Sequence, residues 1–265
     1  MSEVAASNDL FSYLDFAPGA DVREAGEIMR GTGVCVLRSV FPPEFIDYLK
    51  FCVSMGFDLA DARSKFFGYT GLNQFRADFV ERDFVLYREI LEMIAPLGFH
   101  PHGVIEAAVK ASPVYHAMQA YFQTSECDTV QQLMVARRQR PKARTSVLPF
   151  HQDVANYVHA SFVNLWVPLI ACGQDAASLE LVPVATDELL SLTSRSDSLH
   201  PTVEVDEETV FSRFGSECYR PVLAPGDVVL FNQHTIHRTY MPPAASQTRL
   251  SIEIRMCDHF NPTPY

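Results

Sequence analysis

Two short segments of the chain carry residue types that bind metal ions. His151 and Asp153 lie in a segment of strand-like composition, and residues i and i+2 of a strand point to the same face, so both side chains can converge on one ion. A second histidine follows the apolar segment 228–231, where both His234 and His237 are candidates. Two histidines and one carboxylate leave three positions of an octahedron open. Such a site suits iron(II) with a cosubstrate and oxygen better than structural zinc.

A third segment, near the end of the chain, carries a basic residue suited to holding a carboxylate. Arg249 follows His237 by twelve residues (249 − 237 = 12), and it would share one strand face with Ser251, Glu253 and Arg255. A buried guanidinium is costly unless it meets an anion, and the distal carboxylate of 2-oxoglutarate can accept bidentate hydrogen bonds from it. Ser251 can add a hydroxyl donor. Arg255 we interpret as part of a surface ion pair near the end of the strand.

The elements that must position these residues fall into two parts. Before residue 125, helical periodicity predominates. It predicts helices over 21–29, 44–55, 79–94 and 104–122, with one buried strand over 33–37. After it, short segments rich in Val, Leu and Phe predict strands over 131–138, 146–154, 162–171, 179–184, 227–231 and 249–256.

Many short strands without intervening helices indicate a mainly β fold with α. We predict a double-stranded β-helix, a jelly-roll or cupin-like barrel, with the helical N-terminal half packed outside it. The chain is then a single domain over 1–265, in which 1–125 is helical support and 126–265 is the barrel core.

Two further segments are candidates for contact with a substrate. Residues 187–219 have weak periodicity and many serines and acids, so we predict a long loop that could act as a lid. Residues 66–75 are rich in aromatic side chains, and they either pack the N-terminal half onto the barrel or line an apolar pocket.

Composition excludes several classes of function. The chain has 265 residues, of which 48% are hydrophobic, and a net charge of −11, so we expect a sizeable core and no nucleic-acid partner. It contains no apolar run of about eighteen residues, and its N-terminus lacks a basic segment before an apolar one. We therefore expect no membrane segment and no secretory signal. Six scattered cysteines indicate reduced thiols and a cytoplasmic protein, and nothing in the sequence indicates its oligomeric state.

The combination of these motifs resembles the phytanoyl-CoA dioxygenase family of iron(II)/2-oxoglutarate enzymes. Five segments carry the resemblance, in chain order 33–44, 148–153, 164–169, 179–183 and 226–239. They correspond to the opening strand and helix, the metal-binding strand, two barrel strands and the strand of the distal histidine. One departure is visible, because Val184-Ala185-Thr186 stands where the family commonly has a Gly-Ser-His turn.

The resemblance implies a role for individual residues. Iron would be held by His151, Asp153 and His237, with His237 favoured over His234 also by its spacing to Arg249. The cosubstrate site would be formed by Arg249 and its neighbours, and its further members are a hydroxyl at Thr239, an aromatic wall at Trp166 and a basic residue at Arg137.

The activity implied is oxidation of a small or medium-sized organic metabolite at carbon, most simply hydroxylation. Molecular oxygen would be consumed, and 2-oxoglutarate would be converted to succinate and carbon dioxide. The carboxylate of Asp153 argues against halogenation, because related halogenases leave that coordination position free for halide.

Two alternatives come from other classes of protein. One is a metal-dependent cupin-like isomerase or lyase; cupins of that kind usually carry an HxH pair, and the pair in this chain, His100 and His102, precedes the β region. We interpret these two histidines as loop residues at the surface. The other alternative is a non-catalytic barrel that binds a ligand, which would have no need of two histidines, an aspartate and an arginine in this pattern.

Overall fold

The largest sheet combines strands from both parts of the chain. The computed structural model describes residues 9–67, 84–141, 147–155, 161–193 and 204–261. The main sheet has the order β1 (Asp15–Phe16), β2 (Val34–Leu37), β10 (Val228–Asn232), β6 (Val163–Pro168), β12 (Arg249–Asp258), β5 (Val135–Gln139) and β3 (Phe84–Leu86), and β4 (Cys127–Thr129) also pairs with β12. The pair β1–β2 is parallel and β10–β6–β12–β5 is antiparallel, so the sheet is mixed.

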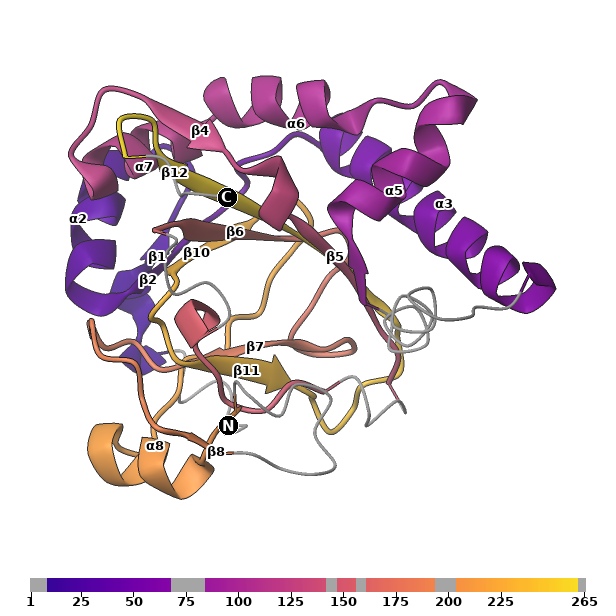
Figure 1. The fold of residues 1–265 in the computed structure, drawn as a ribbon. Coiled ribbons are helices and arrows are strands. Elements are labelled where there is room, and N and C mark those ends of the chain that lie inside the picture. Colours follow the sequence, from indigo (N-terminus) through magenta and orange to yellow (C-terminus); the bar gives the residue numbers. More distant parts are fainter. Residues whose placement is uncertain (1–8, 68–83, 142–146, 156–160, 194–203, 262–265) are drawn as a thin grey trace.

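Helices cover one face of this sheet (Figure 1). They are α2 (Val22–Thr32), α3 (Pro43–Phe67), α5 (Tyr87–Ile94), α6 (Pro101–Lys110) and α7 (Pro113–Phe122). Short 3-10 helices occur at η1 (Ser12–Leu14), η2 (Ala95–Leu97), η3 (Gln131–Leu133) and η5 (Asp153–Ala155). No helix among the described residues has the length and apolar character needed to cross a membrane.

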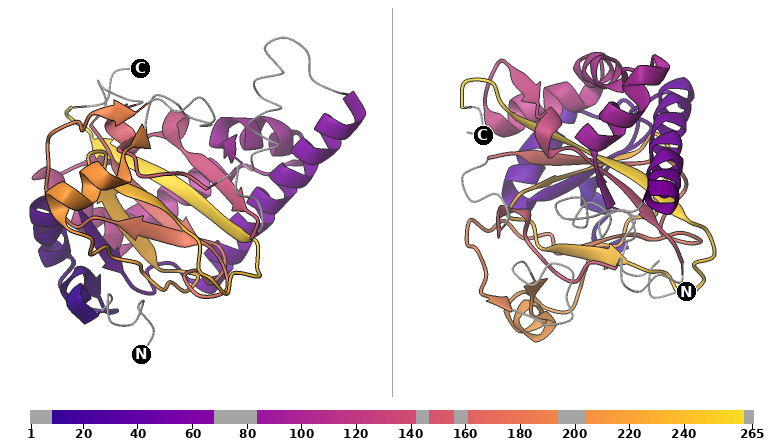
Figure 2. Two further views of the ribbon diagram at one scale, coloured as in Figure 1. Left: turned by 90° about the horizontal axis from the view of Figure 1, so that it is seen from below. Right: turned by 45° about the vertical axis from the view of Figure 1, so that its right-hand side comes forward.

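The opposite face of the main sheet is covered by a second β layer, as the views in Figures 1 and 2 show. In this layer β7 (Ser178–Leu181) pairs with β11 (His237–Tyr240), and β8 (Leu192–Thr193) pairs with β9 (Glu204–Val205). Helix α8 (Glu207–Phe214) follows β9. A mixed sheet with helices is therefore confirmed. Closure of the strands into a barrel stays a prediction.

Alternation of side chains explains why both faces of the main sheet are buried. On β10, Val228 and Leu230 pack in the cluster under the helices, whereas Val229 and Phe231 pack in the cluster against the second layer. Strand β12 differs, since its helix-facing residues are apolar but the alternate residues 249, 251, 253 and 255 are polar and buried. The site is built on that polar face.

Local sequence signals explain several boundaries. The Asp21 side chain accepts a hydrogen bond from Arg23 N at the start of α2, and Gly33 ends that helix with φ of 78°. The helix predicted over 104–122 is two helices, because Pro113 lacks the N–H that an interior position would donate and instead begins α7. Helix α6 begins at Pro101, so His102 lies in a helix and not in the loop that we predicted.

Two other predictions need correction, and a third lies mostly outside the described residues. Residues 84–86, within the helix predicted over 79–94, form β3 and pair with β5; residues 79–83 lie outside the described part. Residues 187–219 are not one long loop, because they contain β8, β9 and α8, with 194–203 outside the described part. Their role as a lid stays untested. Of the aromatic segment 66–75, residues 66–67 end α3 and the rest lies outside the described residues.

Contact between α2 and α7 gives a test of the helical layer. A Cβ added at Gly26 would lie 2.4 Å from Ala117 O and 2.8 Å from Ala120 Cβ, so Gly26→Ala should lower the free energy of unfolding by about 1–3 kcal/mol. The matched control is Gly31→Ala in the same helix, where nothing lies within 4 Å of the added Cβ. That change should stabilise the protein by about 0.5–1 kcal/mol, the usual helix preference of alanine over glycine. Urea unfolding of both variants measures the difference, and equal effects would contradict the packing described.

Candidate metal centre

Backbone hydrogen bonds hold His151 and His237 side by side. His151 N donates to His237 O at 2.9 Å, and His237 N donates to His151 O at 3.0 Å, so the two residues form an isolated antiparallel bridge. Their ring centroids lie 4.1 Å apart. Because His237 also begins β11, which pairs with β7, the spacing of the two imidazoles is set by the second β layer.

Each imidazole is oriented by a backbone carbonyl. Nδ1 of His151 lies 2.8 Å from Pro149 O, and Nδ1 of His237 lies 3.0 Å from Thr235 O. A carbonyl oxygen only accepts, so Nδ1 must carry the proton in both rings, and Nε2 of the neutral ring keeps a lone pair. This is the arrangement in which histidine binds a metal through Nε2.

Asp153 supplies the carboxylate, although not from the strand that we predicted over 146–154. Leu148 O accepts a hydrogen bond from Thr239 N, so the segment runs along β11, but the pairing ends at His151 and Asp153 begins η5. The turn brings Asp153 Oδ1 to 3.9 Å from His151 Nε2. One ligand atom from each of His151, Asp153 and His237 lies within 4.8 Å of the others, and all three residues are buried.

Charges around the site favour the protonation states that a metal needs. Burial, together with the neighbouring His237, lowers the pKa of His151 to about 3, so its imidazole is neutral at physiological pH. Burial raises the pKa of Asp153, but the charge of Arg255 and the hydrogen bond from Asn164 outweigh this effect and hold that pKa well below its usual range. The carboxylate is therefore anionic.

His234 takes no part in this cluster. Among the described residues, the ligand atoms that lie close enough to hold one metal ion belong to His151, Asp153 and His237, and not to His234. The backbone carbonyl of His234 instead accepts a hydrogen bond from the side chain of Gln152, between the two predicted ligands.

A narrow cavity beside the triad contains the predicted cosubstrate residue Arg249. The cavity is lined by residues from the facing layers: Arg137, Leu148, His151, Trp166, Leu179, His237, Arg238, Thr239, Arg249 and Glu253. Arg249 is 2% exposed, and its Nε and Nη1 have no hydrogen-bond partner among the described residues. Burial and the neighbouring Arg137 lower the pKa of Arg249 to about 10, so the group remains a buried cation at neutral pH. A buried guanidinium without hydrogen-bond partners is energetically costly, and binding of an anion in the cavity would offset that cost.

Three of the other predicted cosubstrate residues line this cavity, and the fourth lies beside it. Trp166 lies under Arg249, with the guanidinium carbon 5.6 Å from the ring centroid. Its Nε1 and Ser251 Oγ also have no partner within the described part of the chain. Ser251 is fully buried next to the cavity and is not among its lining residues. Thr239 Oγ1 accepts from Leu148 N at 3.2 Å, and Arg137 Nε donates to Glu253 at 2.8 Å.

Several residues of the site were not predicted from the sequence. Arg255, interpreted as a surface residue, is 2% exposed, because the face of β12 that carries it is covered by the second layer and by the Asp153 turn. Glu253 and Arg238 line the cavity without having been assigned a role. Asn164 donates a hydrogen bond to Asp153. Its role could have been suspected from the sequence, because it is a polar residue within the otherwise apolar strand β6.

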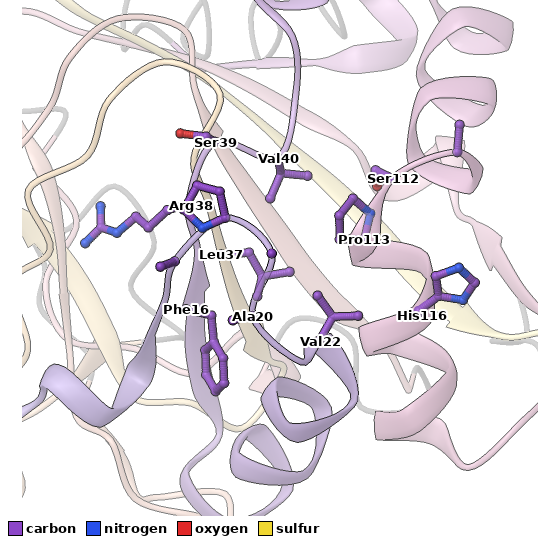
Figure 3. A pocket seen from close by; sticks show the side chains of 14 residues that line it. Phe16, Ala20, Val22, Leu37, Arg38, Ser39, Val40, Ser112, Pro113 and His116 are labelled. Carbon is purple, nitrogen blue, oxygen red and sulfur yellow. The ribbon is translucent and has the colours of Figure 1, made fainter.

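A roomier pocket lies elsewhere, between the loops around β1 and β2 and the start of α7 (Figure 3). It has a volume of about 390 Å³, compared with about 10 Å³ in the cavity beside the triad. None of the predicted site residues lines it. Its walls are mainly apolar side chains, such as Phe16, Val22, Leu37 and Val40, and we assign it no role in the chemistry.

Comparison of the structure with solved ones shows a shared fold. The chain is similar to AviO1 from Streptomyces viridochromogenes Tue57, with a TM-score of 0.56, 16% identity, and coverage of 92% of this chain and 97% of that one. It is also similar to EvdO2 from Micromonospora carbonacea var. aurantiaca complexed with 2-oxoglutarate, with a TM-score of 0.57, 15% identity and coverage of 90% and 93%.

A third similar structure is EctD from S. alaskensis with 2-oxoglutarate and 5-hydroxyectoine, with a TM-score of 0.55, 14% identity and coverage of 90% and 76%. At these identities the likeness shows the fold. No protein-family model matches the sequence, and no curated protein matches it, so the resemblance to phytanoyl-CoA dioxygenases is not confirmed as membership of that family.

The geometry predicts which histidine binds the metal. His151→Ala, Asp153→Ala and His237→Ala should each abolish stoichiometric iron(II) binding, because each removes one of three clustered ligand atoms. His234→Ala is the matched control and should bind iron as the wild type does. Anaerobic titration followed by metal analysis measures this. Loss of iron in His234→Ala together with its retention in His237→Ala would show the assignment to be wrong.

Proposed function

We propose that the chain is an iron(II)/2-oxoglutarate-dependent dioxygenase that hydroxylates, or otherwise oxidises at carbon, a small to medium-sized organic metabolite. The observation that carries the proposal is the buried, unpartnered Arg249 in the same cavity as His151 and His237. A triad alone fits many metal proteins. A triad beside a buried guanidinium whose Nε and Nη1 have no hydrogen-bond partner among the described residues fits a cosubstrate with two acidic ends.

The donor set fits iron(II). Two imidazole nitrogens and one carboxylate oxygen, grouped on one side of an ion, leave coordination positions for a chelating cosubstrate and oxygen. A closed structural zinc site would need a fourth protein ligand. Iron, when bound with 2-oxoglutarate, supplies the activation of oxygen, with release of succinate and carbon dioxide.

This chain's own residues would bind and orient the cosubstrate. The planar guanidinium of Arg249 suits bidentate contact with the distal carboxylate, and Ser251 Oγ, on the same strand face, is free to donate. Trp166 and Leu179 provide the apolar walls, and these walls exclude water. Thr239 and Arg137 lie at the cavity wall as further polar contacts.

The remaining proposals concern the protein as a whole. Strands from both sides of residue 125 pair in one sheet, which supports a single domain over 1–265. A small-molecule substrate and oxygen are the proposed partners. The cupin-like isomerase or lyase has less support: His102 lies in α6, and the group of possible metal ligands among the described residues contains no HxH pair. A non-catalytic barrel leaves the triad unexplained.

Anaerobic addition of iron(II) and 2-oxoglutarate tests the proposal. Chelation of iron by the cosubstrate should give a weak charge-transfer band in the visible region, and admission of oxygen should convert 2-oxoglutarate to succinate. A metal-dependent isomerase or a ligand-binding barrel gives neither signal. Absence of the band, with iron shown to be bound, would refute the assignment of the cosubstrate.

The role of Arg249 has its own test. Arg249→Ala should weaken 2-oxoglutarate binding by well over tenfold while iron still binds, because truncating one partner of a buried charge-assisted pair costs about 2–5 kcal/mol. Arg249→Lys keeps the charge without the planar fork of the guanidinium. Its affinity for 2-oxoglutarate should lie between that of the wild type and that of Arg249→Ala. Titration of the charge-transfer band gives the affinities. An unchanged affinity in Arg249→Ala would move the carboxylate site elsewhere.

A further inference from the structure

One oxygen of Asp153 is already occupied by protein donors. Asn164 Nδ2 donates to Asp153 Oδ2 at 2.8 Å, and Arg255 Nη2 donates to the same oxygen at 3.3 Å. Arg255 Nε also donates to Asn164 Oδ1 at 2.8 Å, so the three side chains form a closed ring of hydrogen bonds. The other oxygen, Oδ1, is the one that lies 3.9 Å from His151 Nε2.

The main sheet itself creates this ring. Arg255 on β12 and Asn164 on β6 are directly paired residues of neighbouring strands, so their side chains leave the same face together. Both are buried, with exposures of 2% and 0%. The guanidinium carbon of Arg255 lies 4.6 Å from the Phe162 ring centroid, and its Nη2 lies 3.7 Å from Glu253. Contacts on several sides therefore fix the arginine.

From this ring we infer that Arg255 and Asn164 are positioning residues that make Asp153 a one-oxygen metal ligand. With Oδ2 held by two donors, Oδ1 is the oxygen left for the metal, and it lies 3.9 Å from His151 Nε2. If Oδ2 were released, the carboxylate could chelate the metal through both oxygens and fill a position that the cosubstrate or oxygen needs. The inference rests on the proposed metal site, and it adds the two residues that keep the site open.

A plain structural role for Arg255 makes a different prediction. As a mere counter-charge to Asp153 and Glu253, it would be replaced well by lysine, which keeps the charge. As a positioning residue it needs the fork of N–H groups that reaches Asn164 and Asp153 at the same time. Arg255→Lys and Arg255→Met separate these two roles.

The test uses cobalt(II) alone, whose visible absorption depends on the number and arrangement of its ligands. Arg255→Met and Asn164→Leu should each bind cobalt(II) roughly 10–100-fold more weakly than the wild type, the usual loss for outer partners of a metal ligand. Their spectra should also change as Asp153 binds through both oxygens. Arg255→Lys should recover only part of the affinity.

The matched control is Arg138→Met. Arg138 lies on β5 and donates to both oxygens of Asp61 at 2.9 Å, away from the triad. This variant should lower the melting temperature and leave cobalt(II) affinity and spectrum unchanged. Wild-type affinity and spectrum in Asn164→Leu would overturn the inference, even where Arg255→Met fails to fold. A wild-type protein that binds no cobalt(II) would instead overturn the proposed metal site.

Discussion

Everything at the site depends on the backbone pairing of His151 with His237. This pair of hydrogen bonds joins the segment 148–151 to β11 and so joins two parts of the second layer that lie far apart in the chain. Both imidazoles then enter the same space from neighbouring strands, and the carbonyls of residues 149 and 235 orient them. The geometry of two ligands thus comes from strand pairing, which is stiffer than a loop.

The second constraint is electrostatic. The face of β12 toward the second layer carries Arg249, Ser251, Glu253 and Arg255, all nearly inaccessible to solvent. Buried charges are tolerated when each is matched, and Glu253 and Asp153 match Arg137 and Arg255. Arg249 has no such carboxylate within the described residues, although Trp166 lies beside it. The space between the two β layers therefore holds an apolar cluster beside the polar face of β12, and Arg249 is a cation on that face without an ion pair in the described part of the chain.

Sequence alone predicted much of this site, because side-chain alternation on strands is regular. The spacing of Arg249, Ser251, Glu253 and Arg255 predicted their common face, and β12 has that face buried as a unit. The spacing could not reveal that Arg255 is buried, because its burial depends on where the Asp153 turn lies in the folded protein. Asp153 was predicted to approach the histidines because it would share a strand face with His151. In the structure it lies near them because a 3-10 turn begins at Asp153.

The same distinction applies to the fold. Prolines and glycines fixed helix ends where they act locally, as at Pro113 and Gly33. The strand at residues 84–86 was hidden by a helical pattern, because its pairing partner, β5, lies some fifty residues further along the chain (135 − 86 = 49). The structured part of 187–219 was missed for a related reason, since β8 and β9 are two residues each and too short for any periodicity. Whether such segments form strands depends on pairing with residues far away in the sequence.

Strand β12 imposes a limit on how this protein can change in length. It carries the unpartnered Arg249 and the Asp153-binding Arg255 on one face, six residues apart (255 − 249 = 6), with the helix-facing Ile252 and Ile254 between them. Inserting or deleting a single residue within it would turn one of the two arginines into the apolar layer under the helices. Residues 241–248 before β12 lie outside the strands and have no alternating face to keep, although Ser246 N and Gln247 N donate to Asp175 O. Natural variation in length should therefore accumulate in that segment, whereas the strand itself can vary by substitution alone.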